Sequence, residues 1–142
     1  MNIYNQLRKR ILVLDGATGT MIQRYKLSEE DFRGEMFENH PVNLLGCNDV
    51  LCLTRPEIMQ EIHNSYLEAG ADIIETNSFN ANRISMLDYG LEDRCYEINK
   101  AAAEVAKKAA TEFIQKDKKP VWVAGSLGPT NRSASISPDI EN

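Results

Sequence analysis

Three short apolar segments that end in small or polar residues limit the fold of this chain more than any other feature. They are ILVLD at 11–15, ADIIETN at 71–77 and VWVAGS at 121–126. Apolar runs of this length that are rich in β-branched residues are typical of strands buried on both faces, as in parallel sheets. The sequence therefore predicts three buried parallel strands.

Two helical patterns separate these strands. The first covers residues 54–70, where apolar residues recur at three- and four-residue spacing. Thr54 and Glu57 can form a capping box there, and Gly70 suits the C-terminal cap. The second pattern begins after Gly90 and is longer. Alternating strands and helices are typical of right-handed parallel α/β folds, whose ligands gather at the carboxyl ends of the strands.

The connection over residues 21–53 differs from the rest, because it mixes charged, aromatic and turn residues with little periodicity. Long connections of this kind are commonly functional or covering. Three parallel strands would also leave both sheet edges unpaired, which proteins usually avoid by closing a barrel or covering the edge. We therefore expect either a small open sheet that pairs with another copy, or a piece of a larger fold.

Composition excludes several classes of function. The formal net charge of -5 comes from interspersed acidic and basic residues, so the chain lacks the basic patch of a nucleic-acid-binding protein. No apolar run approaches the roughly 20 residues of a membrane span, and the polar N-terminus does not match a signal peptide. We expect a cytoplasmic protein that binds neither nucleic acid nor membrane.

The cysteines and histidines carry no recognisable motif. Cys47, Cys52 and Cys95 lack the CxxC spacing of zinc or redox sites, so we expect reduced, mostly packed thiols. His63 lies within the first helical pattern and His40 within the irregular connection. Neither histidine has a partner motif, and we assign no chemistry to either.

The three strand ends carry the polar residues that suggest a ligand. The first, DGATGT, offers backbone N–H groups that can bind a carboxylate or phosphate, but it lacks the lysine of a P-loop and could be a tight turn capped by Asp15. The second carries Glu75, which needs a partner such as a ligand ammonium or Arg83. The third carries Ser126. Together they suit a small zwitterion, with Asp15 or Glu75 taking its ammonium.

Longer stretches around these strand ends form a specific combination: ILVLDGATGTMIQ, GCNDVLCLTRPEIMQEIHNSYLEAGADIIETNSFNANR and VAGSLGPTNRSASISPD. They resemble the start of the homocysteine-binding domain of cobalamin-dependent methionine synthase, from about Ile11 to the last residue. That domain is a (β/α)₈ barrel. The resemblance implies an α/β fold in which residues 1–142 are one partial domain, with the first three βα units of a TIM barrel.

The resemblance also implies an activity and its components. The family activates homocysteine as a zinc-bound thiolate that takes a methyl group from methylcobalamin, and 5-methyltetrahydrofolate remethylates the cobalamin. The whole enzyme would thus be a methyltransferase of methionine biosynthesis, with homocysteine as substrate, zinc and cobalamin as cofactors and its cobalamin and folate domains as partners. The loop amides would hold the substrate carboxylate. The implied substrate-binding residues are Asp15, Gly16, Ala17, Thr18, Glu75, Thr76, Asn77 and Ser126.

One departure from the family is large. Its zinc is held by three cysteines, one after an Asn and two in a Gly-Gly-Cys-Cys context, and neither motif occurs here. A full barrel needs about 250 residues. We therefore assign no catalytic or metal-binding residue, and expect an inactive N-terminal portion that binds no cofactor alone and forms a homo-oligomer. The alternative is a non-catalytic, self-associating module that binds a small amino acid.

Overall fold

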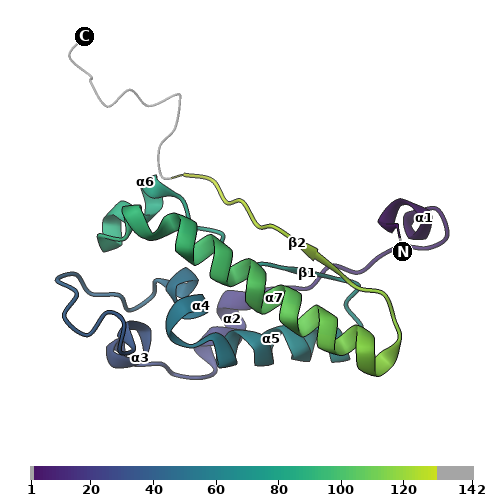
Figure 1. Cartoon of the computed structure of the whole chain (residues 1–142), viewed down its shortest axis with the longest axis horizontal. Helices are drawn as coiled ribbons and strands as arrows, with labels where there is room; N and C mark the ends of the chain where they lie inside the picture. Colours follow the sequence, from purple (N-terminus) through teal and green to yellow (C-terminus); the bar gives the residue numbers. More distant parts are fainter. Residues whose placement is uncertain (1, 131–142) are drawn as a thin grey trace, which may run out of the picture.

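The computed structural model describes residues 2–130, which form an α/β structure (Figure 1). The elements in chain order are α1 (Ile3–Leu7), α2 (Thr18–Gln23), α3 (Glu29–Arg33), the 3₁₀ turn η1 (Asn48–Val50), α4 (Leu51–Thr54), α5 (Pro56–Glu68), β1 (Ile73–Glu75), α6 (Arg83–Met86), the 3₁₀ turns η2 (Leu87–Tyr89) and η3 (Glu92–Arg94), α7 (Cys95–Asp117) and β2 (Trp122–Ala124).

The sheet is parallel, as predicted, but smaller than predicted. Strands β1 and β2 pair in register, with Ile74 opposite Val123. On the other edge of β1, Leu14 makes a single parallel bridge to Ile73. The prediction of three full, buried strands was therefore wrong in two ways. The first strand is one bridge, and each of the others has three residues. The first segment is also exposed, with Ile11 88% and Val13 55% exposed. After β1, the Thr76 N–H donates to Ala124 O at 2.9 Å, and the Ser78 hydroxyl then donates to Ser126 O at 3.0 Å.

Helices α5 and α7 are the two long helices that the periodicity predicts, and they pack against each other and on the sheet. Figure 1 shows α7 crossing the face of β1 and β2. Buried Ile62 on α5 and buried Ile98 on α7 belong to one apolar cluster, while buried Ile74 of β1 belongs to a second. Burial of these faces is the main force that holds the helices on the strands.

The ends of α5 test the predicted caps. Pro56 occupies the first turn, and Gly70 follows the helix with a φ of 108°, which suits glycine. The predicted capping box of Thr54 and Glu57 was wrong. The residue at the N-cap is Arg55, which makes no side-chain cap, and the Thr54 hydroxyl donates instead to Val50 O at 3.4 Å. Thr54 cannot cap α5 because it ends α4.

Residues 21–53 are folded around Arg33. Its guanidinium donates to the carbonyl oxygens of His40 at 2.5 Å and Val42 at 3.1 Å, and its Nε donates to Glu29 at 2.6 Å. Glu29 in turn accepts the N–H of Leu44 at 2.9 Å. These contacts fix a segment without helical or strand periodicity. Hydrogen bonds from Asn77 to Asn48 and from Asn80 to Asp49 then hold η1 at the carboxyl end of β1.

A cluster of ion pairs around the buried carboxylate of Asp72 closes the opposite end of the sheet. Asp72, 1% exposed, accepts two hydrogen bonds from the Arg10 guanidinium at 2.7 and 2.8 Å, and it lies 3.0 Å from Lys119 Nζ. Arg10 holds the pKa of Asp72 well below its usual range. The cluster thus ties the segment before the Leu14 bridge to β1.

Among the helices within residues 2–130, none combines the length and apolarity that a membrane crossing requires.

Candidate functional site

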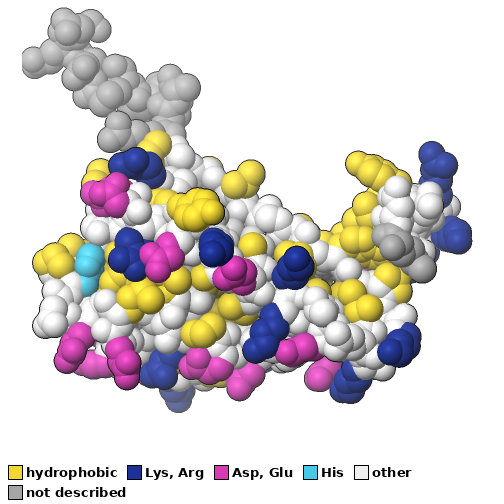
Figure 2. Space-filling model, viewed as in Figure 1, with side chains coloured by type: hydrophobic (Ala, Val, Ile, Leu, Met, Phe, Trp, Pro, Cys, Tyr) yellow, Lys and Arg dark blue, Asp and Glu magenta, His cyan; other side chains and the backbone are white. Residues whose placement is uncertain are grey.

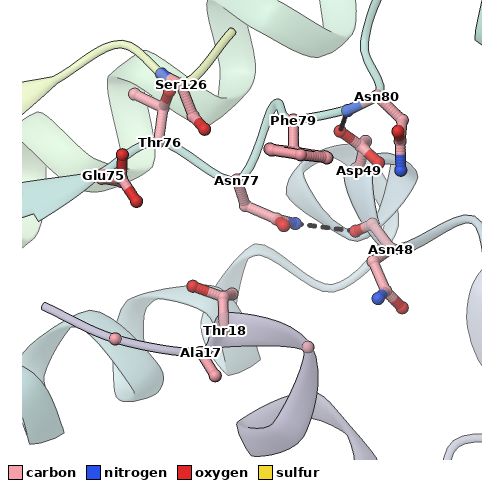
Figure 3. A pocket seen from close by; sticks show the side chains of 12 residues that line it. Ala17, Thr18, Asn48, Asp49, Glu75, Thr76, Asn77, Phe79, Asn80 and Ser126 are labelled. Atoms are coloured by element: carbon pink, nitrogen blue, oxygen red, sulfur yellow. Dashed lines mark hydrogen bonds between the residues drawn. The ribbon is translucent and has the colours of Figure 1, made fainter. Parts of the chain in front are cut away.

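A pocket of about 390 Å³ lies at the carboxyl ends of the strand segments (Figure 3). Figure 3 shows Ala17 and Thr18 across the pocket from Glu75, with Asn48 and Asp49 at one end. The residues that line it are Gly16, Ala17, Thr18, Gly19, Asn48, Asp49, Glu75, Thr76, Asn77, Phe79, Asn80 and Ser126. The structure thus brings together seven of the eight residues singled out in the sequence, and the eighth, Asp15, lies directly behind Glu75.

The loop after Leu14 presents bare backbone to this pocket. Within residues 2–130, no acceptor takes the N–H groups of Gly16, Ala17 or Thr18. Gly16 lies close to the Tyr66 ring, since a Cβ at this position would be 3.4 Å from Tyr66 Oη. The short apolar segment that precedes Asp15 is anchored by the Leu14 bridge, so the loop begins at a fixed point. Such a loop can donate to a carboxylate group.

Asp15 is partly enclosed beneath the pocket. Its Oδ2 accepts the backbone N–H of Glu75 at 3.0 Å, while its Oδ1 is buried with no hydrogen-bond partner among the described residues. Burial raises the pKa of Asp15 to about 6, and the nearby charge of Glu75 acts in the same direction. A buried acceptor without a partner is costly, so this carboxyl group is suited to gain a proton or a cationic neighbour.

Glu75 places a second carboxyl group at the end of β1. It lines the pocket, and no arginine, lysine or histidine within residues 2–130 forms an ion pair with it. The internal partner considered from the sequence, Arg83, pairs instead with Asp93 at 2.9 Å. The carboxylate of Glu75 is therefore available to a ligand.

Three hydroxyl-bearing residues form a closed ring of hydrogen bonds beside the pocket. The N–H of Ser126 donates to Thr76 Oγ1 at 2.9 Å, and Ser78 Oγ donates to Ser126 O at 3.0 Å. Thr76 Oγ1 and Ser78 Oγ lie 2.8 Å apart. Because the Ser78 proton is used on the carbonyl, the Thr76 hydroxyl must be the donor in this last bond. The ring joins the loops after β1 and β2, and it leaves Thr76 no proton to donate to a ligand.

Asn77 is also engaged within the protein. Its Nδ2 donates to Asn48 O at 2.7 Å and lies 3.6 Å from Cys52 Sγ and 3.5 Å from Met59 Sδ. The structure therefore places Thr76 and Asn77 at the pocket, with their donor groups turned to protein partners.

Sequence reasoning missed most of the far end of the pocket, namely Asn48, Asp49 and Phe79. Asn48 and Asp49 belong to η1, at the end of the irregular connection. The sequence GCND marks a turn there, but no periodicity links that turn to a strand end. Asn80 lies at the same end of the pocket and is the third residue after the predicted strand 71–77, in a stretch whose polar residues the sequence already marks.

The cysteines and histidines do not form a metal site. Cys47 and Cys52 are buried, and burial raises the pKa of each thiol to about 12, so both remain protonated. Within residues 2–130, no group of three or more His, Cys, Asp or Glu side chains is arranged to hold a metal ion. His63 is buried and burial lowers its pKa to about 4, while His40 Nε2 donates to Tyr89 O at 2.7 Å. The residues described here therefore do not fit a zinc ion.

A parallel α/β fold with a polar pocket at its strand ends is the arrangement in which many α/β enzymes bind small ligands. The homocysteine S-methyltransferase family matches residues 12–142, so this chain belongs to that family.

Two solved structures of a relative have a similar fold. They are the metallated and oxidised forms of the homocysteine methyltransferase MmuM from Escherichia coli, at 25% and 27% identity, both with a TM-score of 0.68. The matches cover 88% and 87% of this chain but 40% and 39% of the relative. This chain therefore spans about two fifths of the length of that solved enzyme.

Proposed function

We propose that the pocket binds homocysteine and that the chain is part of a methyltransferase that methylates its thiol. The observation that carries this proposal is the pairing across one pocket of unoccupied backbone N–H groups, at residues 16–18, with the unpaired carboxylate of Glu75. The first suits the carboxylate of an α-amino acid, and the second suits its ammonium. Membership in the homocysteine S-methyltransferase family supports homocysteine as that amino acid.

Different residues of the pocket would contact the ammonium, the methylene groups and the other polar atoms of homocysteine. Asp15 adds negative charge behind Glu75, so the ammonium would lie near two carboxyl groups. The exposed ring of Phe79 offers apolar surface for the methylene groups. Ser126 contributes a hydroxyl that bonds no other residue within 2–130, and it can serve as a further polar contact. These residues bind and orient the substrate, and we assign none of them a step in methyl transfer.

The specific enzyme we propose is cobalamin-dependent methionine synthase, because the motifs of this chain resemble its homocysteine-binding domain. In that enzyme methylcobalamin donates the methyl group, and the fold would be a TIM barrel of which residues 1–142 form one partial domain. Transfer requires a deprotonated thiol, and the described residues offer no metal-binding group to favour the thiolate. We therefore expect the 142-residue chain alone to show no turnover, even with zinc, homocysteine and methylcobalamin.

Calorimetry with homocysteine tests the binding proposal. Glu75→Gln should raise the dissociation constant roughly ten- to a hundredfold, since a charge-assisted hydrogen bond contributes about 1.5–3 kcal/mol. The matched control is Glu68→Gln, an exposed glutamate at the end of α5, which should leave affinity unchanged. An analogue without the amino group should bind weakly to both the parent chain and Glu75→Gln. Equal affinity of the parent chain for homocysteine and this analogue would refute the proposed role of Glu75.

A further inference from the structure

The turn formed by residues 77–80 is held to η1 at two points. Asn77 Nδ2 donates to Asn48 O at 2.7 Å, and the N–H of Asn80 donates to Asp49 Oδ1 at 2.8 Å. Both contacts appear as dashed lines in Figure 3. They connect a strand end to a segment about thirty residues earlier, and all four residues line the pocket.

Asp49 makes one of these connections with a buried carboxyl group. Its side chain is 3% exposed, yet its carboxylate faces no arginine or lysine within residues 2–130 and depends on backbone N–H groups, those of Asn80 and Ala81 among them. Burial of an unpaired carboxylate is costly, so the folded chain must keep these N–H groups in place around it. Burial also raises the pKa of Asp49.

The same turn supports the opposite side of the pocket. The carbonyl oxygen of Phe79 accepts the N–H of Gly128 at 3.0 Å, so the residue next to Asn80 connects to the loop after β2. Phe79 itself lines the pocket with an exposed ring. A shift of this turn would therefore move two walls of the pocket together.

We propose that Asp49 is a positioning residue for the ligand pocket: its carboxylate fixes the 77–80 turn, and through it the placement of Phe79 and Asn80 around the substrate. Asp49 acts through the backbone of the turn and does not contact the reacting atoms. The ligand part of this inference rests on the proposed binding of homocysteine. The structural part, the dependence of the turn on Asp49, does not.

A matched control separates positioning from a general effect on stability. Asp31 also uses its carboxylate to accept a backbone N–H, that of Ser28 at 2.9 Å, but it caps α3 and does not line the pocket. Asp31→Asn makes the same substitution as Asp49→Asn at a residue that does not line the pocket, and it also removes the charge that pairs with Arg55. Asp49→Ala removes the acceptor altogether, whereas Asp49→Asn retains an acceptor oxygen without the charge.

The experiment combines amide hydrogen exchange, followed by NMR on the 142-residue chain without ligand, with calorimetric titration of homocysteine. In Asp49→Ala, the protection of the Asn80 amide should fall about tenfold more than that of α7 amides, and the homocysteine dissociation constant should rise about tenfold. Asp49→Asn should recover part of both losses. Asp31→Asn should change neither.

The exchange measurement and the titration test different claims. If the parent chain does not bind homocysteine, the proposed function fails, and the Asn80 exchange rate still decides whether Asp49 holds the turn. If Asp49→Ala does not fold, Asp49→Asn gives the same comparison with Asp31→Asn. Unchanged Asn80 protection in a folded Asp49 variant would overturn the proposal, as would an affinity loss no larger than that of Asp31→Asn.

Discussion

The backbone N–H of Glu75 donates to Oδ2 of Asp15 across 3.0 Å. Glu75 therefore holds the carboxylate of Asp15 with its backbone and presents its own carboxylate to the pocket. The side chain of Glu75 stays free for the pocket, while Asp15 keeps one buried oxygen without a partner. The two acids therefore differ in environment, and burial raises the pKa of Asp15 to about 6. This difference leads to predictions about proton release and stability.

Homocysteine binding should release protons near pH 6. An ammonium close to Asp15 favours its ionised form, and so lowers the pKa that burial has raised. At pH 6, about half a proton per site is available for release, since the pH then equals the pKa of the free site. Calorimetry in buffers of different ionisation enthalpy measures this number. Asp15→Asn should abolish the release, and buffer-independent binding enthalpies in the parent chain would contradict the prediction.

The same shift should make Asp15→Asn stabilising in the absence of ligand. The folded chain binds the Asp15 proton more tightly than the unfolded chain does, because the pKa of Asp15 is about 6 when folded and near its ordinary 3.8 when unfolded. The contribution of this group to folding therefore decreases as pH rises from about 4 to about 6. At pH 7 Asp15→Asn removes the free-energy cost of keeping an ionised carboxylate partly buried. It should also weaken homocysteine binding roughly ten- to a hundredfold. Thermal unfolding at pH 7, beside the titration, would show whether stability and affinity change in opposite directions.

Gly128→Ala should weaken ligand binding. A Cβ at this position would overlap both the carbonyl oxygen and the ring of Phe79, so the loop after β2 or the pocket wall must move. We expect about a tenfold loss of homocysteine affinity, equivalent to about one hydrogen bond. Gly125→Ala is the control, because no atom lies within 4 Å of its added Cβ. Equal affinities of the two variants would show that the Gly128 contact does not position Phe79.

Arg10→Met should lower stability, most strongly at neutral pH. Arg10 holds the pKa of Asp72 below its unfolded value, so the stabilisation is present above pH 4 and is lost as pH falls further. We expect the unfolding temperature at pH 7 to fall by about 5 °C, and by less at pH 3. Arg83→Met should have little effect, since the side chains of its pair with Asp93 are 74% and 82% exposed. Similar losses in both variants would argue against a special role for the buried cluster.

The 142-residue chain should self-associate. Figure 2 shows hydrophobic side chains exposed on the N-terminal segment, where Ile11 is 88% exposed, and Leu127 after β2 is 93% exposed. Within the described residues, β2 pairs with β1 alone, so its other edge offers unpaired backbone. Sedimentation equilibrium should detect a dimer or larger species, and Leu127→Asp should shift it towards monomer. A parent chain that stays monomeric at high concentration would refute this expectation.

Sequence patterns predicted the parallel α/β fold and both long helices, because apolar spacing reflects burial directly. They also pointed to the residues that meet at the strand ends, although the binding role of those residues stays a prediction. The lengths of the strands could not be predicted, since strand pairing joins residues distant in sequence, as in the bridge between Leu14 and Ile73. Asn48 and Asp49 were missed because the hydrogen bonds that hold them at the pocket, to Asn77 and Asn80, join segments about thirty residues apart.

The sequence also could not predict which polar side chains bond to other parts of the protein instead of to a ligand. Thr76 and Asn77 follow a strand just as ligand-binding residues do, but their hydrogens go to Ser78 and Asn48. Nothing in the residue types tells a hydroxyl or amide that binds a ligand from one that joins two loops. That distinction depends on tertiary structure, here on the approach of the loop after β2 to the loop after β1.

The contacts of Arg33 have a consequence for the order in which the chain folds. Its carbonyl partners His40 and Val42 lie seven and nine residues away, whereas the bridge between Leu14 and Ile73 joins residues 59 positions apart. Contacts between near neighbours form faster than contacts that must first close a long loop. The segment that is least regular in sequence should therefore acquire its shape before the sheet does. In pulse-labelled hydrogen exchange, the Leu44 amide bound to Glu29 should become protected earlier than the Asp15 amide bound to Ile73.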